Sequence, residues 1–77
     1  MNPGDLVVIA IYMDRVLPQN ELMIGLVTAV RRVEKDGVRW VDGVRAEVPG
    51  IYADVLVDGI VLRDIPTHWM GVLSAAR

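Results

Sequence analysis

Hydrophobic positions along this chain fall into short runs that turn-forming residues separate. In the segment 54–74, DVLVDGIVLRDIPTHWMGVLS, two apolar runs, Val55–Val57 and Ile60–Leu62, meet at Asp58-Gly59. An Asp-Gly pair between alternating apolar residues predicts a β-hairpin, because a two-residue type I′ turn requires positive φ at both positions. We therefore expect two antiparallel strands that are joined at this pair.

The end of the same segment predicts a final strand. The second apolar run ends at Ile65-Pro66, and Thr67-His68 is expected to form a short 3₁₀ turn. Trp69 follows, and an apolar strand then covers Met70–Leu73. In this position Trp69 is expected to pack against the end of the domain.

The N-terminal half predicts two strands and a loop. Asn2–Asp5 (NPGD) is a turn, since Pro restricts φ and Gly relieves the next position. Leu6–Tyr12 is apolar at consecutive positions, so it is expected to be one strand with both faces covered. Met13–Met23 is expected to be a long loop that is unusually apolar, and Gly25–Val33 is expected to be the second strand.

A second Asp-Gly pair predicts an extra hairpin in the middle of the chain. Val38–Val41 and Val44–Val48 flank Asp42-Gly43. The total is five to seven short strands with no convincing amphipathic helix, which indicates an all-β sandwich or barrel. For a chain of 77 residues we expect a closed or nearly closed barrel, because closure leaves the fewest open strand edges.

Composition narrows the class of protein further. The length allows one domain over residues 1–77, and 53 % of the residues are hydrophobic against a usual ~45–50 %. This excess is large for a small interior and favours an apolar surface that faces a partner. There are no cysteines, which excludes disulfides and thiolate-held metals, and the net charge of −2 gives no general attraction to nucleic acid or acidic membranes.

The N-terminus is expected to belong to the mature protein. The apolar run Leu6–Met13 is far shorter than the ~20 residues that span a bilayer. A secretory signal peptide would carry Lys or Arg before this run, where the chain has Asp5. We therefore expect a soluble protein that no signal peptide directs to secretion.

The titratable residues suggest neither an active site nor a metal or cofactor site. His68 is the only histidine, and catalysis or metal binding would require partners that the neighbouring sequence lacks. The glycines form no phosphate-binding loop. Four acids lie in turns or near strand ends and show no calcium-loop spacing: Asp42, Asp54, Asp58 and Asp64. We expect a non-enzymatic protein without cofactors.

Two segments are expected to contact a partner. The first is the apolar loop and the second is the extra hairpin, where Trp and Arg would supply the binding energy. The candidate residues are Leu17, Leu22, Met23, Arg39, Trp40 and Arg45.

Several motifs, taken in order, resemble a known family. The quoted motifs are Gly4-Asp5-Leu6-Val7, Gly25-Leu26-Val27, Val55-Leu56-Val57-Asp58-Gly59, Ile65-Pro66, Trp69 and Val72-Leu73-Ser74. In this order they resemble the small SH3-like barrel proteins encoded in tailed-bacteriophage genomes. The departure is the stretch 34–52, which is longer than the simple loop of that family and leaves the register of the middle strands open.

The resemblance implies a fold and a kind of partner. The fold would be a small SH3-like barrel with an extra hairpin and a 3₁₀ turn before the last strand. Small barrels in virions act as decoration, lining or connector pieces, so the partner would be a larger virion structural protein or copies of this chain. We expect a structural or interaction subunit of a homo- or hetero-oligomer, located in the virion or the host cytoplasm.

The alternative function is nucleic-acid binding. The start of the chain also resembles the KOW-type barrels of transcription and ribosomal proteins, although only Gly25 of that motif's loop is matched. Cations would contact phosphates and an aromatic ring would stack on a base. The residues that would do so are Arg31, Arg32, Lys35, Arg39, Trp40 and Arg45, and acids interrupt this cluster.

Overall fold

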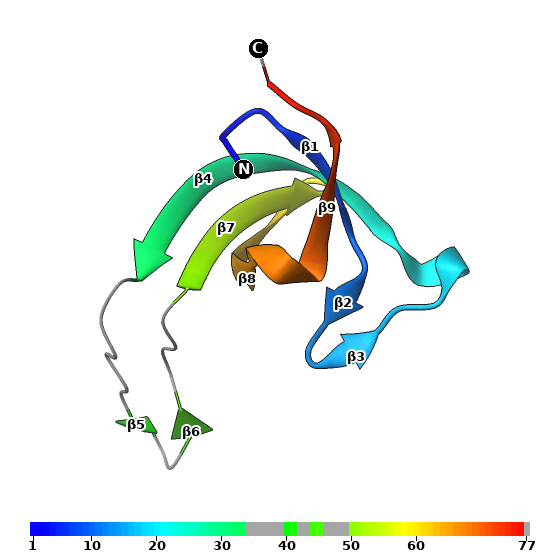
Figure 1. Cartoon of the computed structure of the whole chain (residues 1–77). Coiled ribbons are helices and arrows are strands. Elements are labelled where there is room, and N and C mark those ends of the chain that lie inside the picture. The colour runs from blue at the N-terminus through cyan, green and yellow to red at the C-terminus, as the bar shows by residue number, and fades with distance from the viewer. Residues whose placement is uncertain (34–39, 42–43, 46–49, 77) are drawn as a thin grey trace.

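The chain folds as an all-β domain built on one antiparallel sheet (Figure 1). The computed structural model describes residues 1–33, 40–41, 44–45 and 50–76. The strands are β1 (Leu6–Ile9), β2 (Ile11–Tyr12), β3 (Arg15–Val16), β4 (Met23–Val33), β5 (Trp40–Val41), β6 (Val44–Arg45), β7 (Gly50–Val57), β8 (Ile60–Pro66) and β9 (Met70–Ser74). Two 3₁₀ turns complete the described elements, namely η1 (Gln19–Glu21) and η2 (Thr67–Trp69).

The main sheet has the strand order β8-β7-β4-β1-β9. Two short ladders, β2-β3 and β5-β6, stand apart from it. Within the described residues no ladder joins β8 to β9, so the hydrogen bonding of the sheet is open at these two edges. Figure 1 shows the sheet strongly curved, with η2 inside the curve. The all-β class, the extra hairpin and the 3₁₀ turn before the last strand are confirmed.

The Asp-Gly hairpin forms as the sequence predicts. Asp58 and Gly59 have φ values of 50° and 78°, and Val57 pairs with Ile60 across the turn. This is the backbone that a type I′ turn requires. The second hairpin is also present, because Trp40 pairs with Arg45 and Val41 with Val44. Asp42 and Gly43 of that hairpin lie outside the described residues, as do the outer parts of the two predicted strands.

The prediction of one strand over Leu6–Tyr12 and a loop over Met13–Met23 is wrong. The strand divides at Ala10, whose N–H donates to the carbonyl of Trp69 and whose carbonyl accepts from the N–H of Leu17. The supposed loop contains η1 and β3, and β3 pairs with β2 in a hairpin that turns at Met13 and Asp14 with φ of 51° and 59°. A left-handed Met is uncommon, so local composition gave no signal for this turn. Four strands of only two residues explain why the described chain has nine strands rather than five to seven.

The hydrophobic core lies on the inner face of the sheet. Its members are buried residues from β1, β4, β7 and β8 together with Leu17, namely Val7, Ile9, Leu17, Val27, Ala53, Val55, Val57 and Ile65. Tyr12, Trp69 and Met70 are partly buried and pack against this cluster, so the predicted packing role of Trp69 is confirmed. The part of the chain that the structure describes contains no helix long and apolar enough to cross a membrane.

Candidate functional site

A row of apolar side chains crosses the outer face of the main sheet. Leu6 of β1 pairs with Leu26 of β4, which pairs with Leu56 of β7, which in turn pairs with Val61 of β8. Successive residues of a strand point to opposite faces. Because Val7, Val27 and Val55 point into the core, these four side chains point away from it. Between 36 and 42 % of each residue is exposed.

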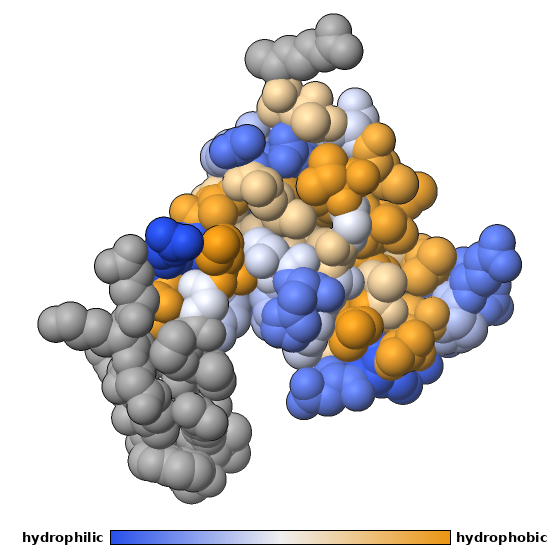
Figure 2. All heavy atoms as spheres, viewed as in Figure 1, coloured by the Kyte–Doolittle hydropathy of each residue, from blue (hydrophilic) through white to orange (hydrophobic). Residues whose placement is uncertain are grey.

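A second pair of residues extends this apolar area. Val8 is half-buried and pairs with Ile24, which is 59 % exposed. On its other side Val8 pairs with Gly71 of β9, which has no side chain. We call these six residues the outer patch: Leu6, Val8, Ile24, Leu26, Leu56 and Val61. Figure 2 shows hydrophobic side chains gathered on the side of the molecule formed by β1 and β9.

Polar residues border the outer patch. Asp54 lies two positions before Leu56 on β7, and its carbonyl accepts a hydrogen bond from the Thr28 hydroxyl at 3.3 Å. The Asp54 carboxylate accepts from the backbone N–H of Asp64 at 3.0 Å and lies 3.7 Å from the guanidinium of Arg63. The turn at Asp58 follows directly after the end of β7, two positions beyond Leu56. The patch itself therefore contains no charge, and at its border the Asp54 carboxylate lies beside the Arg63 guanidinium.

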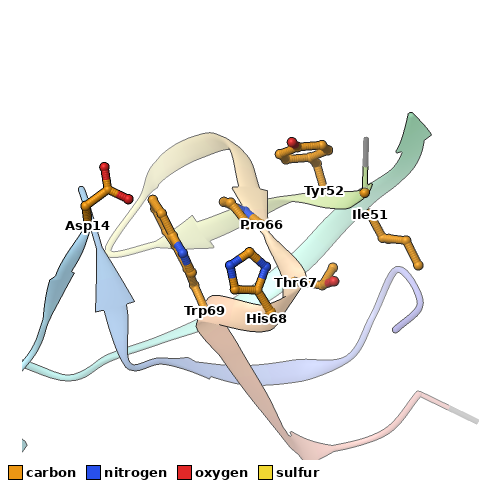
Figure 3. A pocket seen from close by; sticks show the side chains of 8 residues that line it. Asp14, Ile51, Tyr52, Pro66, Thr67, His68 and Trp69 are labelled. Atoms are coloured by element: carbon orange, nitrogen blue, oxygen red, sulfur yellow. The ribbon is translucent and has the colours of Figure 1, made fainter. Parts of the chain in front are cut away.

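A cleft of about 260 Å³ lies around η2 and the start of β7 (Figure 3). Asp14, Tyr52, Pro66, His68 and Trp69 line it, together with Gly50, Ile51 and Thr67. Figure 3 shows Trp69 and His68 rising from η2, with Pro66 behind them and Asp14 reaching over from the β2-β3 turn. The rings of His68 and Trp69 are edge-to-face with centroids 6.2 Å apart.

The chemistry of this cleft is mainly aromatic. His68 is exposed and belongs to the 3₁₀ turn, as the sequence predicts. No group of three His, Cys, Asp or Glu that could hold a metal ion occurs among the described residues. The cleft can offer stacking surfaces from Tyr52, His68 and Trp69, and one carboxylate from Asp14.

The structure describes the side chains of three of the predicted partner-binding residues. Leu17 is only 8 % exposed and belongs to the core, where its N–H is bonded to the carbonyl of Ala10. Leu22 is 38 % exposed, whereas Met23 is half-buried against the core. The prediction for Arg39 lies outside the described residues, and for Trp40 and Arg45 the structure describes only the backbone of β5 and β6.

The basic cluster is partly engaged within the chain. Arg31 and Arg32 are exposed on β4, and the Arg31 guanidinium lies 2.8 Å from the Asp64 carboxylate. The same guanidinium lies 5.8 Å from the centre of the Tyr52 ring, within cation–π distance. Lys35 and Arg39 lie outside the described residues. Within the described part of the chain, the charge of Arg31 is therefore paired with an acid.

Comparison with known proteins identifies no relative, since no family model, no curated protein and no solved structure matches the chain.

The outer patch is a surface that the sequence-based prediction of site residues missed. The sequence did carry a signal for this patch, because Leu6–Ile9 and Val55–Val57 are apolar at every consecutive position. Such runs indicate that both faces of a strand are apolar, but they do not say that one of these faces is left exposed.

Proposed function

We propose that the protein is a small, non-enzymatic interaction subunit that binds another protein through the outer patch. We further propose that its open sheet is an SH3-like barrel of the type encoded by tailed bacteriophages, and that the chain is a structural component of the virion. The observation that carries the binding function is the registered row Leu6–Leu26–Leu56–Val61 on the outer face.

The energetics of the exposed row support a binding function. An antiparallel sheet with one solvated face normally alternates apolar and polar residues, and polar residues cover the solvated face. Here four strands contribute an apolar residue to that face at the same level. Burial of apolar area contributes about 25 cal/mol per Å², so covering this row would stabilise a complex.

The strand order supports the SH3-like interpretation. The order β8-β7-β4-β1-β9 places the first long strand between the last strand and the second long strand. The 3₁₀ turn η2 then connects the two edges of the sheet across the inner side, where Trp69 reaches the core. The virion assignment depends on the sequence motifs, and a fold of this kind does not by itself define a function.

The test is incorporation into particles. Tagged wild-type chain, Leu26→Lys and Val16→Lys are supplied in turn during growth of the virus that encodes the chain. Purified particles are then analysed by quantitative mass spectrometry. Leu26→Lys places a charge in the outer patch, so its copy number should fall at least about tenfold, equivalent to ~1.4 kcal/mol of binding free energy.

Val16→Lys is the matched control. Val16 lies on β3, outside the outer patch, and it is 74 % exposed. This variant should enter particles as the wild type does. Absence of the wild-type chain from particles would contradict the virion assignment. A purified chain that binds DNA or RNA with a steep loss of affinity on adding salt would favour the nucleic-acid alternative.

A further inference from the structure

We propose that the cleft around η2, here called the η2 cleft, binds an arginine side chain that a partner protein presents. The eight residues that line the η2 cleft include none of the outer patch. The proposal therefore adds a second contact with a protein and goes beyond the function proposed above. Three features of the cleft select this ligand, namely its rings, its carboxylate and its size.

The walls of the η2 cleft are held in place by the fold. Trp69 packs against the core. Tyr52 pairs with Arg31 of β4 on one side and with Pro66 of β8 on the other. Asp14 comes from the β2-β3 turn on one side of the cleft and Tyr52 from β7 on the other, with Trp69 between them (Figure 3). A site whose side chains are already ordered loses less entropy when it binds a ligand.

The rings and the carboxylate of the cleft select a cation. The face of an aromatic ring carries negative potential and attracts a positive charge, and a Trp ring does so most strongly. Asp14 adds a full negative charge, and it forms no ion pair with any described residue. The same charge repels phosphate and other anions, so it disfavours a nucleotide in this cleft.

A neighbouring contact within the chain shows how this fold holds a guanidinium. The guanidinium of Arg31 lies 5.8 Å from the centre of the Tyr52 ring and 2.8 Å from a carboxylate oxygen of Asp64. A ring and a carboxylate thus hold one planar cation together. The η2 cleft offers a second ring and carboxylate, Trp69 and Asp14, on its walls. Arginine suits them better than lysine, because a guanidinium is planar, stacks on rings and binds a carboxylate through two N–H groups.

The size and the rim of the cleft indicate a single side chain as the ligand. The volume of about 260 Å³ is below the ~300–1,000 Å³ of pockets that enclose whole small molecules. Four of the eight lining residues are exposed, namely Asp14, Gly50, Ile51 and His68. A ligand here would be only partly enclosed, whereas small-molecule sites bury ~70–90 % of the ligand surface. The cleft therefore suits the tip of a side chain whose main chain stays outside.

NMR titration of the ¹⁵N-labelled full chain tests the proposal, with the indole N–H of Trp69 as the reporter. The probe is N-acetyl-arginine amide, and N-acetyl-citrulline amide is its uncharged match of nearly the same shape. Trp40 is the only other tryptophan, so a Trp40→Phe chain identifies the Trp69 signal. The arginine probe should shift this signal with a dissociation constant on the order of 1–10 mM, and the citrulline probe should bind at least about tenfold more weakly.

Asp14→Asn removes the charge of the carboxylate and keeps the size of the side chain. It should weaken binding of the arginine probe at least about fivefold, because the rings alone then hold the cation. Glu21→Gln is the matched control, since Glu21 is an exposed acid that pairs with Arg15 and does not line the cleft. This control should bind the probe as the wild type does. Trp69→Phe, which leaves a smaller ring in the same place, should weaken binding as well.

Two further probes check the class of the ligand and its source. N-acetyl-lysine amide should bind several times more weakly than the arginine probe. A peptide with one arginine between glycines should bind at least as tightly as the single amino acid, because its main chain remains outside the cleft. Equal binding of the lysine and arginine probes, tighter binding of guanosine, or a peptide that does not bind would each overturn the proposal.

The remaining outcomes concern the cleft itself. A Trp69 signal that stays in place up to about 50 mM arginine probe would contradict the proposal, and so would one dissociation constant shared by Asp14→Asn and the wild type. Leu26→Lys, which alters the outer patch, should bind the arginine probe as the wild type does. Failure of either site in its own experiment therefore leaves the other proposal intact.

Discussion

Asp5 is the buried polar residue that ties the two ends of the chain together. It is 2 % exposed, and its carboxylate accepts hydrogen bonds from the N–H of Ala76 at 2.6 Å and of Asn2 at 2.9 Å. Its backbone carbonyl also accepts from the N–H of Val27. The sequence predicted a turn here, but it gave no sign of the bond to Ala76, which lies 71 positions away.

These bonds lower the pKa of Asp5. The largest cause is the backbone N–H of Ala76, followed by that of Asn2, because both stabilise the charged carboxylate. The folded-state pKa is then below the unfolded-state pKa. The stabilising contribution is therefore fully present above the unfolded-state pKa, and it is lost as the pH falls through the folded-state pKa.

We predict that Asp5→Asn lowers the melting temperature at neutral pH and removes part of the acid sensitivity of the wild type. The amide cannot provide a charged acceptor for both N–H groups. The measurement is the thermal midpoint of both proteins between about pH 7 and pH 2. The difference between them should shrink as the pH falls. Asp14→Asn is the control, since Asp14 is exposed in a turn, and an equal shift for both variants would contradict this role of Asp5.

Among the strands, β4 is the central element and passes very close to β7 at Gly25. A Cβ atom at Gly25 would lie 2.5 Å from Cγ1 of Val55, 2.7 Å from Cγ2 of Val57 and 2.7 Å from the carbonyl oxygen of Leu56. Real Cβ atoms do not approach other atoms so closely. The glycine therefore allows two core valines to pack over β4, and it is needed for the space rather than for a special φ.

We predict that Gly25→Ala destabilises the domain by about 1–3 kcal/mol, the usual cost of overfilling a packed core. Gly71→Ala is the matched control in the same sheet. There the nearest atom to an added Cβ is Cγ1 of Val8 at 3.7 Å, an ordinary contact. Its effect on the free energy of unfolding should be within about 0.5 kcal/mol. Urea unfolding measures both variants, and equal effects would show that β4 and β7 are not closely packed at Gly25.

At the scale of the whole molecule, one small core holds the sheet and η2 together. Ile9 is completely buried in it, and it lies near the point where β1 ends and the chain enters the β2-β3 hairpin. A domain of 77 residues is stabilised by only about 4–12 kcal/mol in total. A single cavity in this core therefore removes a large share of the stability.

We predict that Ile9→Ala lowers the free energy of unfolding by about 2–5 kcal/mol, through lost burial and the cavity that remains. Ile60→Ala makes the same chemical change on β8, where the residue is 64 % exposed, and should cost much less. Denaturant unfolding, followed by circular dichroism, compares the two variants. If Ile60→Ala were as costly as Ile9→Ala, the assignment of the inner face as the core would be wrong.

Local features of the sequence were sufficient for the strands next to strong turn signals. The Asp58-Gly59 hairpin, the N-terminal turn and the 3₁₀ turn at Thr67–Trp69 depend on the conformational preferences of a few adjacent residues. The β2-β3 hairpin was missed because Met13 and Asp14 adopt positive φ without a glycine. Contacts made elsewhere in the fold decide that conformation.

The candidate site was less predictable than the fold. The excess of hydrophobic residues predicted that some apolar surface faces a partner. Leu17, which was predicted to lie on that surface, is instead in the core. The residues that are exposed together, Leu26 and Leu56, are 30 positions apart and meet only through the β4-β7 register. Register depends on pairing over long distances along the chain, which an apolar pattern by itself does not specify.

The sequence by itself determined that this protein is all-β, where its strongest turns lie, and that it has more apolar residues than a small interior can hold. These are local or summed properties of the chain. Only the tertiary structure decided which face of each strand is buried. Adjacent residues such as Leu6 and Val7 are both apolar, and the choice between them depends on which side the core residues of β4 and β7 occupy. That choice leaves Leu6, Leu26, Leu56 and Val61 together on the surface.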